Sequence, residues 1–417
     1  MSKFSEVLKN RNFFLLWLGQ IISQVGDRLG QMALIALVSV RPGNSTIAIA
    51  KVLFFTIAPV FIIGPLAGVY VDRWDRRRTL YISDTLRAML MLAIPLFLFN
   101  FTVLIPLYAV IFLVFCIGRF FIPAKLSILP ELVENKDMLI ANSLINITGM
   151  IAAILGFGIS GILVEWWGAK GGFYLDAASF FVSALLIFLI AKKSTRQMDL
   201  RKVSQEIVEV ISKSVVQEIK EGLLYFFKNK EIRFASWVMF ILSAALGSCS
   251  VVLIGFIQDA FHSVTRDFGL LSMFLGLGLF LGSLVYGRFG QRFSSYKIIF
   301  VSLVISGKIL FVFVLNVQYN PSFLIAVALS LIMGVFISPI IIAVNTTIHS
   351  SSANHMMGKI FSSLEVVMHL GFILFMFASG LLAKIVPHST ILMSCSFIFI
   401  ILGLVNLIFH RRIPWLD

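Results

Sequence analysis

The sequence predicts an all-α membrane protein in which twelve transmembrane helices form two six-helix bundles. Of its 417 residues, 59% are hydrophobic and only 13% are charged, and the mean hydropathy is +0.98. A soluble globule of this size would have too little polar surface to cover itself. Long apolar spans separated by polar segments, and similar motifs in the two halves of the chain, are the other two observations behind this prediction.

Twelve apolar spans follow one another along the chain. We place them near residues 12–39, 46–71, 79–99, 103–124, 139–165, 171–191, 233–259, 268–289, 297–315, 321–345, 358–385 and 389–410. Most reach the roughly 20 residues that a helix needs to cross about 30 Å of hydrocarbon. The first span is too long for a signal peptide and lacks a small-residue cleavage site, so we expect it to remain as a helix.

The distribution of basic residues predicts the orientation of these spans. If the amino terminus is cytoplasmic, the loops on that side hold most of the 34 Lys and Arg residues, and the opposite loops hold few. This asymmetry predicts a multi-pass protein of a bacterial plasma membrane, the cell inner membrane, with both termini in the cytoplasm.

A polar insert divides the chain into two halves. We predict an N-terminal six-helix bundle over residues 1–191, a cytoplasmic linker over 192–232 and a C-terminal six-helix bundle over 233–417. In the linker, apolar residues of SVVQEIKEGLLYFFKNKEIR fall on one helical stripe, which indicates an interfacial helix. A solvated connector with some helix is the alternative.

Short motifs recur between the halves at an offset of about 216 to 219 residues. The run Gly118–Pro123 (GRFFIP) recurs as Gly334–Pro339 (GVFISP), and SGIL at Ser160 recurs as SGLL at Ser379. Together they indicate a duplicated six-helix unit, and such repeats are typical of transporters whose central site opens to either side in turn.

The charged segment Gly68–Leu80 (GVYVDRWDRRRTL) carries a family resemblance. It resembles the loop between helices 2 and 3 of the major facilitator superfamily, G-x-L-a-D-R-x-G-R-K-x-x-L, with Asp75 in place of Gly and Tyr70 in place of Leu. The resemblance extends over essentially the whole chain and implies the major facilitator fold.

Further runs are similar to one exporter branch of that superfamily. They are Leu16–Gln20, Gly26-Asp27, Asp84–Arg87 and Ile122–Val133. The branch includes macrolide efflux proteins, an enterobactin exporter and lysophospholipid transporters. The resemblance therefore implies a secondary active transporter that exports a lipophilic or amphiphilic small molecule by alternating access. Lysophospholipid translocation across the inner membrane is one alternative, and a non-transporting membrane sensor or assembly factor is another.

The charged loop is predicted to form a cytoplasmic gate. Asp72 can accept hydrogen bonds from the free N–H groups of a helix amino terminus, and the resemblance implies the helix that begins near Gly358. The other residues predicted to take part in gating are Gly68, Arg73, Arg76, Arg77, Asp84 and Arg87. In the alternative interpretation, the arginines only set the topology.

Ionisable side chains inside apolar spans are costly, so each is expected to face a partner or a cavity. Six residues are candidates for contact with substrate or coupling ion, namely Asp27, Arg28, Arg119, Lys125, Glu365 and His369. Asp27 is predicted to take up a proton or face the substrate; permanent pairing with an Arg, or capping of a neighbouring helix, is the alternative. By resemblance, Arg119 stands where similar transporters carry an Arg proposed for proton transfer; a salt bridge between helices is the alternative. Glu365 and His369 lie one turn apart and could relay a proton, or the His could merely satisfy the Glu.

The sequence predicts no catalytic residue, cofactor or metal site. It contains no P-loop and no G-x-S-x-G elbow. Three cysteines, Cys116, Cys249 and Cys395, fall inside apolar spans at unrelated spacings. The formal charge of +14 is spread over short loops, which does not favour nucleic-acid binding. We expect a monomer whose partners are the lipid bilayer, a small-molecule or lipid substrate, and a proton or sodium gradient.

Overall fold

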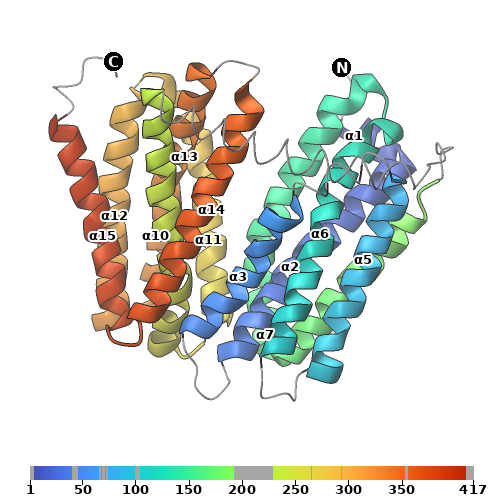
Figure 1. Cartoon of the computed structure of the whole chain (residues 1–417), viewed down its shortest axis with the longest axis horizontal. Coiled ribbons are helices and arrows are strands. Elements are labelled where there is room, and N and C mark those ends of the chain that lie inside the picture. The colour runs from blue at the N-terminus through green and yellow to red at the C-terminus, as the bar shows by residue number, and fades with distance from the viewer. Residues whose placement is uncertain are drawn as a thin grey trace. The chain divides into compact units, whose positions relative to one another are not determined.

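The computed structural model describes residues 4–39, 46–64, 67, 71, 74–98, 104–191, 229–263, 265–292, 294–352 and 356–409 (Figure 1). Within these ranges every regular element is a helix. The chain divides into two compact units, one comprising Met1–Arg41 with Lys51–Val215 and the other comprising Pro42–Ala50 with Val216–Asp417. The predicted interfacial helix comprises residues 214–233, of which 214–228 lie outside the described residues and 230–233 begin a longer helix, Lys230–Phe261.

Most of the described residues up to 191 lie in helices. In chain order they are α1 (Phe4–Lys9), α2 (Arg11–Ser39), α3 (Thr46–Ile62), α5 (Arg76–Ala93), the π-helical turn η1 (Ile94–Leu98), α6 (Ile105–Leu132), the 3-10 turn η2 (Asn135–Asp137) and α7 (Met138–Phe188). In the first unit α2 packs along α7, and α5 packs on both α6 and α7. The short helix α1 precedes the first predicted span and was not expected.

The helix α7 contains two membrane crossings. It is 51 residues long, and a straight helix of that length would be more than twice as long as the hydrocarbon core is thick. Gly168 interrupts it with φ 70° and ψ 175°, a conformation that only glycine adopts at little cost. The chain therefore turns back at this position, between the fifth and sixth spans predicted from the sequence.

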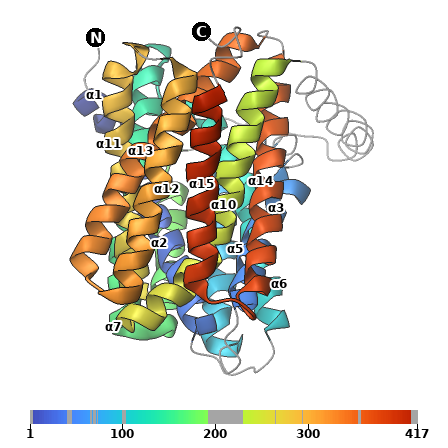
Figure 2. The ribbon, with the colours of Figure 1, turned by 90° about the vertical axis from the view of Figure 1, so that its left-hand side faces the viewer.

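The helices from residue 229 onward belong to the second unit. They are α10 (Lys230–Phe261), α11 (Thr265–Phe289), the 3-10 turn η4 (Gly290–Arg292), α12 (Ser295–Tyr319), α13 (Phe323–Ser351), α14 (Met357–Leu382) and α15 (His388–Phe409). Within this unit α15 lies between α12 and α10, and α10 packs on α14 (Figure 2).

The predicted fold class is confirmed. Ten helices in the described part of the chain are long and apolar enough to cross a membrane, and one of them is the doubly crossing α7. The helix α3 is a shorter apolar helix of 17 residues. With α7 counted as two crossings and α3 included, the described chain has twelve transmembrane helices in two six-helix bundles. The chain is a multi-pass membrane protein.

Two asparagines close corresponding helix ends in the two units. The side-chain oxygen of Asn10 accepts hydrogen bonds from two backbone N–H groups at the start of α2, at 3.0 and 3.2 Å, and its amide donates to the carbonyl of Leu132 at 2.7 Å. Asn229 caps α10 in the same way and donates to the carbonyl of Ser351 at 3.3 Å. In both units, the hydrogen bond from the asparagine side-chain amide to the carbonyl joins residues that are 122 positions apart. The internal repeat thus extends from sequence motifs to matching hydrogen bonds.

Candidate functional site

A cavity of about 470 Å³ lies among α2, α5, α6 and α7 of the first unit. Its polar lining consists of Gln20, Ser23, Gln24, Asp27, Arg28, Gln31, Arg87, Arg119, Lys125 and Asn146. Apolar side chains such as Phe115, Phe121 and Ile122 complete the wall. A pocket with an apolar wall and convergent polar groups is suited to an amphiphilic ligand.

The polar stripe on α2 follows directly from helical periodicity. Gln20, Gln24, Asp27 and Gln31 are spaced by four, three and four residues, so that their side chains share one face of the helix. We predicted Asp27 from its charge and missed the glutamines. Their spacing within an apolar span is the signal that could have found them.

Arg87 connects the cavity to the interior of the unit. Its side chain is 7% exposed and forms an ion pair with Asp84, one turn earlier on α5, whose side chain is 0% exposed. The Nη1 atom of Arg87 also lies 3.7 Å from Oδ1 of Asp27, whose side chain is 38% exposed. One guanidinium therefore joins a carboxylate that meets the cavity to a carboxylate that is fully buried.

Aromatic rings and a hydroxyl hold this network in place. The guanidinium of Arg87 lies over the ring of Phe180 at 4.1 Å and over that of Phe121 at 5.0 Å. The Oγ of Ser183 donates to Oδ2 of Asp84 at 2.6 Å. Desolvated cation–π contacts and a satisfied carboxylate stabilise Arg87 beside Asp84.

A second arginine lies on the α2 side of the cavity. Nη1 of Arg28 donates to Oε1 of Gln31 at 2.8 Å, and the guanidinium lies 4.6 Å from the centre of the Phe157 ring. A Cβ atom at Gly156 would lie only 3.0 Å from Cγ of Arg28, so the small residue leaves room for the arginine stem. Gly156 therefore allows α7 to pack closely against α2.

The structure brings together four of the six predicted coupling residues. Asp27, Arg28, Arg119 and Lys125 all line the cavity. The other two are in the second unit, on α14, where Nδ1 of His369 lies 2.8 Å from the backbone oxygen of Glu365.

The residues predicted to form a gate fall into separate groups. Arg76 pairs with Glu131 of α6. The guanidinium of Arg77 donates to the carbonyls of Ile187, at 3.4 Å, and Phe188, where a cation is favoured by the helix dipole.

The other gate residues lie elsewhere. Asp84 and Arg87 belong to the buried network two turns further along α5. Three more, Gly68, Asp72 and Arg73, lie outside the described residues. The latch between Asp72 and the helix near Gly358 stays a prediction.

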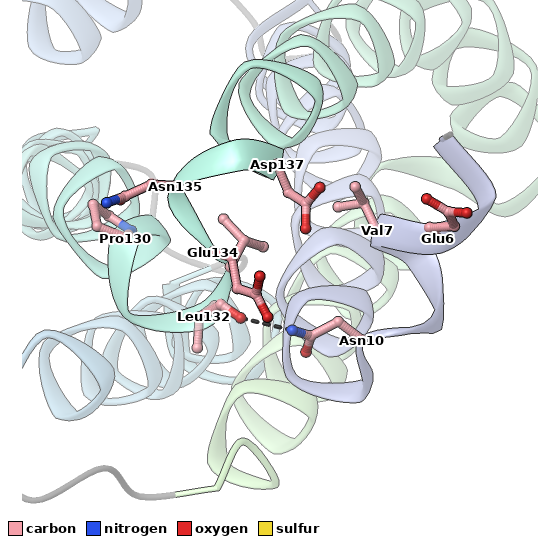
Figure 3. A pocket seen from close by; sticks show the side chains of 9 residues that line it. Glu6, Val7, Asn10, Pro130, Leu132, Glu134, Asn135 and Asp137 are labelled. Atoms are coloured by element: carbon pink, nitrogen blue, oxygen red, sulfur yellow. Dashed lines mark hydrogen bonds between the residues drawn. The ribbon is translucent and has the colours of Figure 1, made fainter. Parts of the chain in front are cut away.

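A second pocket of about 650 Å³ lies at the ends of the helices of the first unit. Figure 3 shows the carboxylates of Glu6, Glu134 and Asp137 around it, and the hydrogen bond from Asn10 to the carbonyl of Leu132. Its polar groups are those expected where helices end in water. We therefore place the candidate site in the smaller cavity, where charged groups lie within the membrane-crossing part of the helices.

The comparisons with known proteins agree with this architecture. The profile of a family described as transmembrane secretion effector matches residues 2–415. The chain is 26% identical to the uncharacterized MFS-type transporter YkuC of Bacillus subtilis (strain 168), over 85% of this chain and 81% of that relative. It is 25% identical to the putative bacilysin exporter BacE of the same strain, over 97% of both chains. It is 23% identical to the multidrug efflux pump Tap of Mycolicibacterium fortuitum, over 86% of both.

A solved structure shows the same fold. The nucleoside transporter NupG matches with a TM-score of 0.73 and 14% identity, over 96% of this chain and 99% of that one. The relatives and the structural neighbour are transporters rather than enzymes. On the strength of the family profile, which spans nearly all of its length, the chain belongs to the transmembrane secretion effector family of the major facilitator superfamily.

Proposed function

We propose that this protein is a secondary active exporter of an amphiphilic organic molecule and works by alternating access. The observation that carries the proposal is the cavity of the first unit, in which charged side chains and aromatic rings lie side by side. Similarity to a putative bacilysin exporter and a multidrug efflux pump supports export as the direction. We further propose that it lies in a bacterial plasma membrane with both termini in the cytoplasm, as its basic loops predict.

The charges of the cavity favour a substrate with an anionic or zwitterionic polar group. Four cations and one carboxylate are among the described lining residues, and Asp84 balances one of those cations, Arg87. Even without Arg119, the cations Arg28 and Lys125 outnumber the single carboxylate of Asp27. A carboxylate or phosphate would meet complementary charge there, while Phe115 and Phe121 would contact an apolar part of the same molecule.

Lysophospholipid translocation is a second candidate, because the same lining suits it. A lysophospholipid combines a phosphate with one acyl chain, so Arg28 or Lys125 could bind the phosphate. The relatives named above do not favour this substrate over a peptide or a drug. Direct comparison of probes is needed to separate the two candidates.

The ion gradient is proposed to act through Asp27 and Arg87. Asp27 is partly exposed and lies within ion-pair distance of Arg87. Uptake of a proton by Asp27 would weaken this pair, so that protonation is linked to the arrangement of α2 and α5.

The test is transport by purified protein in liposomes with an imposed proton or sodium gradient. The probes are a fluorescent lysophospholipid, which carries a phosphate, and radiolabelled erythromycin, which is a cation with a large apolar ring. The charge of the cavity predicts faster transport of the phosphate-bearing probe. Failure of both probes to move under either gradient would count against the proposed function, and preference for erythromycin would count against the proposed substrate class.

A further inference from the structure

The buried carboxylate of Asp176, in the second part of α7, lacks the partners that such a group normally has. Its side chain is 0% exposed, and neither Oδ1 nor Oδ2 has a hydrogen-bond donor among the described residues. The nearby hydroxyl of Ser179 is already used, since it donates to the backbone oxygen of Asp176 at 2.7 Å. An ionised carboxylate in such a place would be far more unfavourable than a neutral carboxylic acid.

Two glycines of α2 make the space that this carboxyl group occupies. A Cβ atom at Gly30 would lie 2.1 Å from Oδ2 of Asp176, and one at Gly26 would lie 3.0 Å from Oδ1. The two glycines are one turn apart, so together they form a smooth patch on α2 opposite the acid. The carboxyl group is thus a packed part of the interface between α2 and α7.

The surrounding charges cannot balance a further anion. The charged groups that act on Asp176 are Asp27 from α2 and Asp84 and Arg87 from α5. Arg87 already pairs with Asp84 and approaches Asp27. The charged groups acting on Asp176 are thus two carboxylates and one guanidinium, and among the described residues that guanidinium forms its ion pairs with the two other carboxylates.

We propose that Asp176 is a buried proton-binding site, and that Arg87 changes carboxylate partners when the proton leaves. This inference rests on the proposed transport function. The O–H bond of the Asp176 carboxyl breaks and the proton passes to water that enters from the cavity, which leaves a carboxylate. Arg87 then moves toward Asp176 and leaves Asp27, and Asp27 is free to take up a proton from the cavity. The water gains the O–H bond that Asp176 loses, and the proton that Asp27 binds comes from water in the cavity.

Infrared difference spectroscopy tests the protonation state without any substrate. The spectrum of the wild type minus that of Asp176→Asn, both at neutral pH, isolates the signal of this one carboxyl group. We expect the C=O band of a protonated acid, and we expect Asp176→Glu to shift that band. The bands of an ionised carboxylate in the same difference spectrum would overturn the proposal. Asp27→Asn is the matched control, because it removes a carboxyl group that is partly exposed to the cavity.

Transport by the same variant tests the role of the site in coupling. In liposomes, Asp176→Asn should lose accumulation of the lysophospholipid or erythromycin probe under a proton gradient, and should retain exchange of labelled for unlabelled probe. Proton-driven accumulation at the wild-type rate would overturn the proposal. If the wild type moves neither probe, the proposed function fails, and the infrared result alone decides on Asp176.

Discussion

At the residue scale, the contacts of the Arg87 guanidinium matter most for the stability of the first unit. It pairs with a fully buried carboxylate and lies against two aromatic rings, so its positive charge is held away from water. Removing one member of a buried pair leaves the other charge uncompensated, and this is strongly destabilising. Arg87 therefore stabilises the first unit as well as connecting Asp84 to the cavity.

Substitution of this arginine has a calculable consequence. Arg87→Met should lower the free energy of unfolding by about 3–5 kcal/mol, because it leaves Asp84 buried without a cation. Arg87→Lys should cost less, since it keeps the charge but lacks the planar fork. Thermal unfolding in detergent measures both. Arg78→Gln is the control, because Arg78 is exposed and its ion pair with Asp75 is 3.7 Å long. Its substitution should change the free energy of unfolding by less than about 1 kcal/mol. Equal effects at the two positions would contradict this account.

The sequence indicated which residues belong to the site better than it indicated which residues they contact. The sequence shows Asp84 and Arg87 at a spacing of three, so their ion pair follows from helix geometry. Their meeting with Asp27 depends on the packing of α2 against its neighbours, which no spacing reveals. The sequence likewise marks Asp176 as a costly residue, but its lack of partners emerges only from the burial of both oxygens.

At the element scale, close contact between α2 and α7 depends on glycine. Gly30→Ala should destabilise the protein by about 1–3 kcal/mol, since the added methyl group would overlap the carboxyl of Asp176. The control is Gly118→Ala in α6, where the nearest atom would lie 3.8 Å away. There we expect no loss and a small gain, because alanine favours a helix more than glycine does. Thermal unfolding distinguishes the two variants, and a Gly30→Ala protein as stable as the wild type would refute the packing argument.

The paired asparagine caps provide a second prediction for the elements. Asn10→Ala and Asn229→Ala should each cost about 0.5–2 kcal/mol, because each removes a helix cap. Asn10→Asp should cost less than Asn10→Ala, since it keeps the capping oxygen and loses only the donor to Leu132. The same order is expected at Asn229. Unfolding midpoints in detergent measure all four variants, and a marked effect in only one unit would show that the caps are not equivalent.

Helix existence was predictable because hydropathy over about 20 residues is a strong signal in a membrane protein. Helix ends were less predictable. Nothing in the run Asn10-Arg11-Asn12 tells which asparagine caps α2, and the backbone angles that Gly168 adopts within α7 depend on packing. The short helix α1 was missed because six residues carry too little periodicity to be recognised.

At the scale of the whole molecule, buried charge is distributed unequally. Among the described residues, the buried charged side chains of the first unit are Asp84, Arg87 and Asp176, all within membrane-crossing helices. The second unit has Asp267, at the start of α11, beside Arg266 at 3.0 Å. The two units therefore share a fold and corresponding caps but differ in their interior chemistry. This difference is the reason why we propose that ion coupling takes place in the first unit.

The net charge of the cavity leads to a prediction about the transporter as a whole. Lys125→Gln should raise the KM for the fluorescent lysophospholipid about tenfold or more, because a charge-assisted hydrogen bond is worth about 1.5–3 kcal/mol. The KM for erythromycin should stay the same or fall, since one repelling cation is gone. Lys136→Gln is the matched control, because Lys136 is exposed and pairs with Glu134 outside the cavity. Initial rates in liposomes give both constants. If Lys125→Gln slowed the two probes equally, the residue would support the structure of the cavity rather than select the charge of its substrate.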